Sequence, residues 1–399
     1  MAKRKKLGWT AAGAARAARE SRIATAGFLR EAELAYEMQA HRLMDLHQVK
    51  TAHLGAGQES AALQLMVAGY GYDPESWMPA NFAQFGAMVT TDQGSDLASA
   101  DLYILSPQMC DVVVAAALSL SFDDLSLMAK EDLPTPRGLV VLPHPLLVRS
   151  IGGEVSDDRA FGWNGTLLGS RVDMAKQSWV REPAVRITSF YDTFGPVQPD
   201  SFRQLAARAR AEKTPLPPLM LDGLQCLWFG LKTVDEQREA MDQYREVTRE
   251  HSQAQLAEAE KLGLDETRMV GDYVPGAEIP DDDGFFTARF LYAFWRLCEQ
   301  DIAEVSPTEV GHAARVTSER AGVPAEVRVA QLRPTARPAV SADGPDVDRW
   351  NHRWVVRMHK VRQWYPSEQR HKVIYRGPYV KGPEDKPLLG GEVVRHLTT

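Results

Sequence analysis

The stretch DLPTPRGLVVLPHPLLV, residues 132–148, marks a change in the character of the chain. Its prolines and Gly138 interrupt the helical pattern of the residues before it. The apolar run at 139–142 that follows is rich in valine and leucine and is bounded by Pro143. Such a run is typical of a β-strand with an edge or a bulge at the prolines. We therefore predict that a β-rich region begins here.

Upstream of this stretch, apolar side chains recur at helical spacing. The clearest case is residues 23–50, where Phe28, Tyr36, Leu43 and Leu46 follow one face of a predicted amphipathic helix. We predict a helical N-terminal region over residues 23–130. Residues 1–22, which contain four consecutive Lys and Arg residues at 3–6, are predicted to be a basic flexible tail.

Downstream, strand and helix patterns alternate within a predicted α+β domain over residues 131–399. Strands are expected within 138–190 and 325–376. Between them we predict a helical insertion over 233–322, with a polar helix after the capping box Thr233–Glu236 and another helix starting at Ser306 and Pro307. The predicted fold class is α+β: a helical N-terminal region followed by a mainly antiparallel sheet with helices packed on it.

The composition is that of an ordinary globular protein. The chain has 399 residues, 44% hydrophobic and 25% charged, with a net charge of −7. The best apolar run, residues 112–120, is too short to cross a bilayer, so we expect no membrane partner. Three scattered cysteines, Cys110, Cys226 and Cys298, fit a reducing cytoplasm and form no CxxC pair. We expect a cytoplasmic protein without metal or other cofactor.

No complete catalytic motif is visible. The sequence contains no Walker A loop, GxGxxG, GxSxG or HExxH pattern, and we assign no catalytic residue. The prediction is therefore a protein that is not an enzyme.

The most informative part of the sequence is its C-terminal end. Residues 346–399 hold eleven Lys and Arg against six Asp and Glu, a local net charge of +5. Histidines and aromatic residues are interspersed with these cations. We predict a basic hairpin over 350–376 with a turn at Pro366. The candidate binding residues are Arg353, Arg357, His359, Arg362, Trp364, Tyr365, His371, Lys372, Tyr379 and Lys381.

This mixture of residues is open to several interpretations. Cations that contact phosphates beside planar rings that stack on bases are typical of surfaces for RNA or single strands. The same pattern fits a sheet edge protected by charge, or a site for an acidic or extended peptide. A metal-independent ribonuclease that uses His359 and His371 is a further alternative.

Two groups of residues carry a family resemblance. The first is residues 132–146 (DLPTPRGLVVLPHPL) with 159–163 (RAFGW). The second is residues 353–359 (RWVVRMH), 363–367 (QWYPS), 371–375 (HKVIY) and 378–388 (PYVKGPEDKPL). In these residues, under a quarter of its length, the chain resembles a family of phage, plasmid and actinobacterial proteins that includes a type V-A anti-CRISPR protein. One departure is that Lys360 and Val361 follow His359, where the family has an aromatic and a basic residue.

The resemblance implies a regulator rather than an enzyme. The anti-CRISPR member suppresses biosynthesis of its target nuclease by recognising the nascent polypeptide, with loss of the mRNA. We therefore expect a mobile-element or phage-related regulatory protein that binds a nascent polypeptide or other protein target, with RNA or the ribosome as a further partner. A structural subunit that docks through the helix at 233–262 is the remaining alternative.

Overall fold

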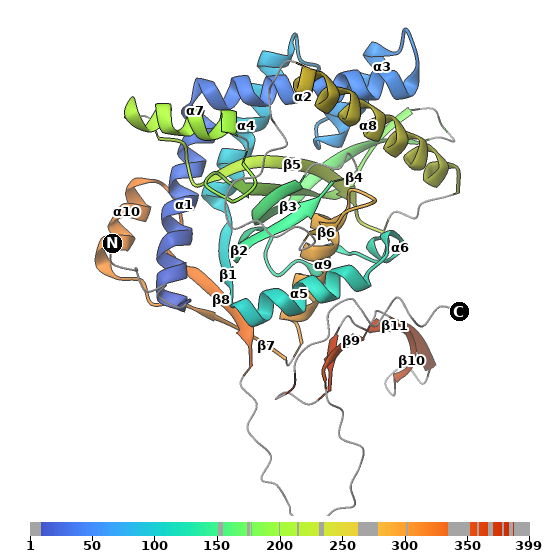
Figure 1. Cartoon of the computed structure of the whole chain (residues 1–399). Helices are drawn as coiled ribbons and strands as arrows, with labels where there is room; N and C mark the ends of the chain where they lie inside the picture. Colours follow the sequence, from blue (N-terminus) through green and yellow to red (C-terminus); the bar gives the residue numbers. More distant parts are fainter. Residues whose placement is uncertain are drawn as a thin grey trace, which may run out of the picture.

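The centre of the fold is a mixed sheet of eight strands (Figure 1). The computed structural model describes residues 9–150, 155–173, 176, 178–198, 200–213, 215–230, 235–261, 278–300, 302–333, 352–356, 359–365, 370–376, 379–382 and 386. The strands of this sheet are β1 (Asp101–Leu105), β2 (Arg137–Arg149), β3 (Val155–Asp173), β4 (Ser178–Asp192), β5 (Leu219–Trp228), β6 (Ile279–Pro280), β7 (Ala303–Pro307) and β8 (Val327–Leu332).

The order of the strands is β5-β4-β3-β2-β1-β8-β7, and β6 pairs with β2. Strands β2 to β5 form consecutive antiparallel pairs, as do β7 and β8. Strand β1 lies parallel to both of its neighbours, β2 and β8. The α+β prediction is confirmed, and the stretch at 132–148 supplies β2, whose register with β3 shifts between Val141 and Leu146, around the two prolines.

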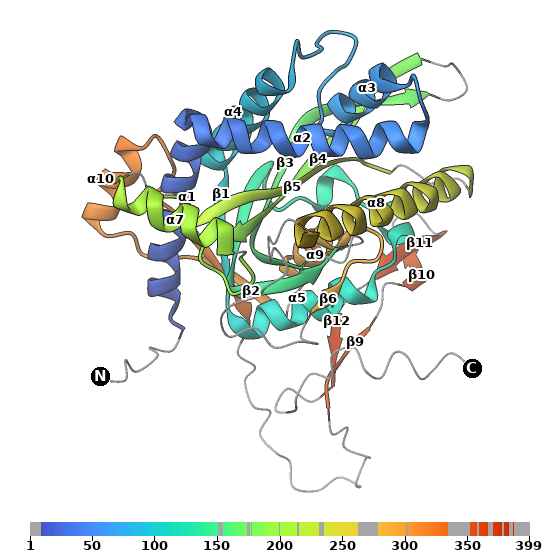
Figure 2. The same ribbon diagram turned by 45° about the horizontal axis from the view of Figure 1, so that its top comes forward.

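Helices cover both faces of the sheet, as Figures 1 and 2 show. They are α1 (Ala11–Glu31), α2 (Glu33–Leu54), α3 (Glu59–Gly69), α4 (Phe82–Ser99), α5 (Pro107–Ser119), α6 (Phe122–Leu125), α7 (Asp200–Ala211), α8 (Asp235–Lys261), α9 (Phe286–Cys298) and α10 (His312–Arg320), with a 3-10 turn at Lys130–Asp132. One core joins α5 and α9 to the sheet, and a second core joins α1, α2 and α4 to its other face. Alternate residues of β2, such as Val140 and Val141, enter opposite cores because strand side chains alternate.

The predicted boundaries at the N-terminal end are wrong in two respects. Residues 11–22 are not a tail, because they form the first half of α1, where Thr10 caps the helix by accepting from the Gly13 amide. Arg22 is fully buried and donates to the carbonyl oxygens of Ala100 (2.9 Å) and Pro324. The basic residues at 3–6 lie outside the described residues. Within 23–130, β1 is a central strand of the sheet rather than part of a helical region.

The predicted insertion at 233–322 contains strands as well as helices. Helix α8 confirms the polar helix, although Thr233 of the capping box lies outside the described residues. Ser306 and Pro307 do not start a helix: they end β7, which pairs with β8. Since β7 is an edge strand, it tolerates the missing amide hydrogen of a proline.

The C-terminal strands form two small ladders outside the large sheet. Strand β10 (His359–Tyr365) pairs with β11 (Arg370–Arg376), so that part of the predicted hairpin is confirmed. Strand β9 (Trp354–Val356) pairs instead with β12 (Tyr379–Lys381). The expected strand over 350–365 is therefore divided between two ladders, and neither ladder extends the large sheet. Val355 packs against the core that contains α5, beside which β9 lies in Figure 1.

Candidate ligand-binding site

A cavity of about 730 Å³ lies along the edge strand β5. Helices α2 and α3 border it on one side, and α6 with the start of α9 borders it on the other. Tyr244 of α8 also lines it. Its volume falls in the range of roughly 300–1,000 Å³ that is usual for sites that hold small ligands or anchoring side chains.

Every residue of β5 from Asp222 to Trp228 lines this cavity. Successive side chains of a strand point to opposite faces of a sheet. A cavity on one face would therefore meet every second residue, whereas this cavity meets all of them. It follows that the cavity reaches the outer edge of β5, the last strand in the order of the sheet, and it also extends over the sheet to Ser189 of β4 and Asp158 of β3.

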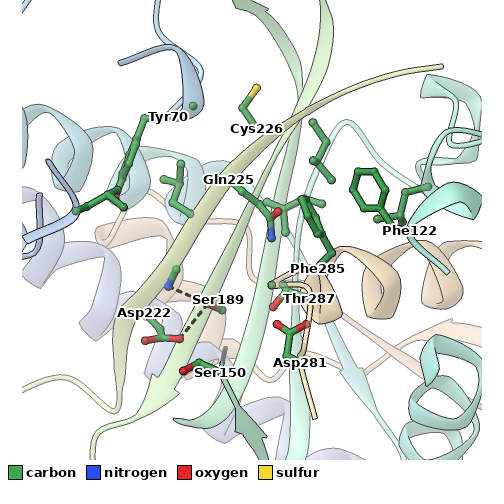
Figure 3. A pocket seen from close by; sticks show the side chains of 18 of the residues that line it. Tyr70, Phe122, Ser150, Ser189, Asp222, Gln225, Cys226, Asp281, Phe285 and Thr287 are labelled. Atoms are coloured by element: carbon green, nitrogen blue, oxygen red, sulfur yellow. Dashed lines mark hydrogen bonds between the residues drawn. The ribbon is translucent and has the colours of Figure 1, made fainter. Parts of the chain in front are cut away.

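The walls of the cavity are mainly apolar. Phe122 and Phe285 contribute aromatic rings whose centroids are 4.6 Å apart. Met66 from α3 and Leu46 from α2 line the other side. Figure 3 shows Phe122 and Phe285 on one side of the opening and Tyr70 across from them. Such walls favour an apolar ligand body, because its burial removes apolar surface from water.

One end of the cavity is acidic. Asp158, Asp222 and Asp281 line it, with the hydroxyl groups of Ser156 and Ser189 between them. Ser156 donates to Asp158 Oδ1 (2.9 Å), and both serines donate to Asp222 Oδ2 (3.4 and 3.3 Å). Figure 3 shows Asp222, Ser189 and Asp281 gathered at this end.

Asp158 and Asp281 at this end hold their protons more tightly than an ordinary aspartic acid. Burial, followed by repulsion from Asp222, raises the pKa of Asp158 well above its ordinary value. Burial also raises the pKa of Asp281 to about 6, although the Phe286 amide and Arg289 oppose the shift. Burial thus disfavours the full negative charge of this end.

Two arginines partly balance these carboxylates. Arg42 of α2 pairs with Asp222 at 2.9 Å. Arg289 of α9 is shared between Asp283 and Asp281, the latter at 3.4 Å. Lys50 of α2 also lines the cavity, where its ammonium lies 4.5 Å from the centre of the Tyr244 ring, and burial lowers its pKa.

The residues predicted as a binding surface lie elsewhere. Arg353 precedes β9 and donates to the Lys386 carbonyl oxygen (2.9 Å); Tyr379 and Lys381 belong to β12, the partner of β9. Arg357 lies outside the described residues. The other six candidates belong to the β10–β11 hairpin: His359, Arg362, Trp364, Tyr365, His371 and Lys372.

The register of the hairpin divides these six positions between two faces. Trp364 pairs with His371, and Arg362 lies two residues from Trp364, so these three share one face. The positions of His359, Tyr365 and Lys372 belong to the other face. His359 and His371, the pair considered for ribonuclease chemistry, therefore occupy opposite faces of the ladder.

Sequence reasoning missed the acidic cavity. Asp158, Asp222 and Asp281 come from three distant parts of the chain, and no motif connects them. The Asp281 carboxylate lies at the start of α9, where its Oδ1 accepts from the Phe286 amide at 2.9 Å. The one available signal was the pair Asp157-Asp158 inside a strand, where carboxylates are uncommon.

Comparisons with family models, curated proteins and solved structures find no match to the chain. The resemblance to the anti-CRISPR-like family therefore stays a prediction from the residues quoted above. Among the described residues, no helix has the length and apolar character needed to span a bilayer. The same residues contain no group of three His, Cys, Asp or Glu side chains placed to hold a metal ion.

Proposed function

We propose that this protein is a non-enzymatic, mobile-element-related regulatory protein that binds an extended polypeptide segment in the cavity along β5. The observation that carries the proposal is the unbroken lining from Asp222 to Trp228, which places the outer edge of a strand against an open, apolar cavity. A polypeptide can add to such an edge through backbone hydrogen bonds and insert side chains into the adjoining space.

The two ends of β5 differ in a way that supports this proposal. Near its start, side chains from the helices already use the carbonyl oxygens: Thr25 donates to Leu219 (3.3 Å) and Arg42 donates to Leu221 (2.9 Å). From Asp222 onward the strand faces the cavity instead. An added segment would therefore begin where the helices stop covering the strand.

The resemblance favours the same class of partner. It implies recognition of a nascent polypeptide, and a nascent chain is an extended segment with unpaired backbone groups. RNA contact through the C-terminal strands, and docking through α8, stay predictions from the sequence. The division of the basic candidates between two ladders and two hairpin faces makes the cavity the better supported site.

The test is selection of random-sequence peptides from a display library on the full-length protein, followed by affinity measurement on the enriched peptides. Leu46→Trp fills the cavity from α2 and should weaken peptide binding at least tenfold. Met44→Trp is the matched control, since Met44 is an exposed apolar residue of the same helix that does not line the cavity.

Peptide binding should also protect amide hydrogens of residues 223–228 from exchange. Thermal unfolding of both variants checks that they fold. Failure to enrich any peptide would overturn the proposal, as would peptides whose binding is equally strong in Leu46→Trp and Met44→Trp.

A further inference from the structure

We propose that the acidic end of the cavity binds an ammonium or guanidinium group on an apolar stem, as in a lysine or arginine side chain, with Asp158 as its counter-ion. This inference rests on the proposed function for its biological ligand, a basic residue of the bound polypeptide. It adds a specificity that the open edge of β5 alone would not supply.

The acidic end of the cavity holds more carboxylates than cations. Three carboxylates line the cavity and a fourth, Asp283, shares Arg289 with Asp281, whereas two guanidinium groups, those of Arg42 and Arg289, pair with them. Arg289 is shared between two carboxylates. When all four are ionised, the acidic end carries more negative than positive charge.

Asp158 is a buried carboxyl group at the wall of the cavity. Its exposed fraction is 3%, yet it lines the cavity. Its hydrogen bond comes from the neutral hydroxyl of Ser156, and no described Arg, Lys or His forms an ion pair with it. An isolated buried carboxylate is costly unless a cation pairs with it.

The groups around Asp158 come from several elements. Asp157 precedes it on β3, Asp222 faces it from β5, and Asp281 faces it from the loop before α9. Each of these carboxylates disfavours ionisation of Asp158. Arg42 and Arg289 reach Asp222 and Asp281 rather than Asp158, and Lys50 lies over the Tyr244 ring.

The cavity combines apolar walls with an acidic end, which suits a basic side chain. A basic side chain combines an apolar stem with a charged head, and such stems pack along apolar surfaces while the head reaches a polar group. Here the apolar walls lead to the acidic end within one cavity. A neutral apolar side chain would leave that end unpaired, and an acidic one would be repelled.

A consequence for proton balance follows. Burial and Asp222 both disfavour the charge of Asp158 and raise its pKa, so its carboxyl group retains a proton to a higher pH than usual. A bound cation reverses that preference, so the carboxyl releases a proton as the cation binds. Cation affinity should therefore increase as pH rises.

The test uses three small probes with the same stem: 4-phenylbutylamine, 4-phenylbutan-1-ol and 4-phenylbutyrate. Calorimetric titration of the full-length protein in two buffers with different ionisation enthalpies measures both affinity and proton release. The amine should bind at least tenfold more tightly than the alcohol, with proton release, and the butyrate should bind weakest.

Asp158→Asn should abolish the proton release and reduce the preference for the amine to about twofold or less, while the alcohol binds as before. The control is Asp45→Asn, an exposed position of α2 that does not line the cavity. If Asp158→Asn fails to fold, the pH dependence of amine binding to the wild-type protein tests the inference instead. Amine affinity should then rise between pH 5 and 9 while alcohol affinity stays constant.

Equal affinities for amine and alcohol, or an amine affinity that does not change with pH, would overturn the inference. These outcomes are separate from those of the peptide selection. Enriched peptides without basic residues would overturn this inference alone, and amine binding without any enriched peptide would overturn the proposed function alone.

Discussion

Asp157 and Asp158 are neighbours on β3 with different surroundings. Asp158 faces the cavity, whereas Asp157 is fully buried and accepts from the Gln198 side-chain amide at 2.6 Å. A side chain at Gly195 would place its Cβ 1.6 Å from Asp157 Oδ2, so this carboxyl occupies space that a glycine leaves open. Burial raises the pKa of Asp157 to about 7, although the Val197 amide and Gln198 oppose the shift.

This shift predicts a pH dependence of stability. Between pH ~4, the ordinary pKa of an aspartic acid, and pH ~7, the folded protein holds a proton that the unfolded chain releases. Stability contributed by Asp157 is therefore greatest below pH ~4, declines as pH rises to ~7, and is then constant. Urea unfolding across this range should show that decline in the wild type, and a smaller one in Asp157→Asn.

The test compares how the free energy of unfolding of the two proteins changes with pH, not its value at one pH. This is necessary because Asp157→Asn also changes the hydrogen bond with Val197 at every pH. Asp45→Asn, at an exposed position, should reproduce the wild-type profile. Parallel profiles for wild type and Asp157→Asn would contradict the assignment.

At the scale of the element, the β2–β3 pair brings together Gly138 of the 132–146 stretch and Trp163 of the 159–163 stretch. The two residues are directly paired, and a Cβ on Gly138 would lie 2.1 Å from the Trp163 ring. The indole Nε1 donates to the Thr135 carbonyl oxygen at 2.8 Å, which fixes the ring over the glycine. The ring then packs against Trp295 of α9, with centroids 5.8 Å apart.

Gly138→Ala should therefore destabilise the protein by about 1–3 kcal/mol, the usual cost of overpacking a core. Gly27→Ala is the matched control, because a Cβ at that position in α1 meets nothing within 4 Å. In a helix this change should stabilise by ~0.5–1 kcal/mol. Urea unfolding measures both, and a Gly138→Ala variant as stable as the wild type would contradict the close packing.

The elements that could be predicted are those whose pattern is local. Strands β2 to β4 follow a break by proline and glycine, and helix α8 follows from its polar sequence. Strand β1 was missed because its last four residues are all buried. It therefore lacks the alternation of apolar and polar residues that is typical of a strand with one solvent-exposed face. Arg22 was wrongly assigned to a tail. Its hydrogen-bond acceptors, the carbonyl oxygens of Ala100 and Pro324, are distant in the sequence, so no local pattern indicates that it is buried.

The candidate cavity could not be predicted from the sequence. Its acidic end depends on β3, β5 and the loop before α9 meeting in space, and its position depends on β5 being the edge of the sheet. The basic residues near the C-terminal end could be identified from the sequence. Their division between two ladders depends on which strands pair, and the sequence pattern does not show this. The charge pattern of the sequence therefore indicated the C-terminal strands as the binding surface, whereas the structure places a cavity along β5.

At the scale of the whole molecule, the large sheet is complete once β8 is in place. A chain that ends at residue 333 contains all eight of its strands, and the chain beyond it adds the two small ladders. We expect residues 1–333 to unfold cooperatively, with a lower melting temperature because Val355 no longer packs against the core.

A chain that ends at residue 326 lacks β8 and leaves one side of β1 unpaired. It should show no cooperative thermal unfolding by circular dichroism. Retention of a cooperative transition in residues 1–326, or its loss in residues 1–333, would contradict the role of β8 as the strand that completes the sheet.

The parallel position of β1 between β2 and β8 also has a consequence for how the protein is made. The roughly 220 residues that separate β1 from β8 need about 10–40 s of synthesis at ~5–20 residues per second. Throughout that time β1 exposes an open edge, which is a template for pairing with other chains. Completion of the sheet thus waits until residues 327–332 have been synthesised, and any chaperone that shields this edge must act before then.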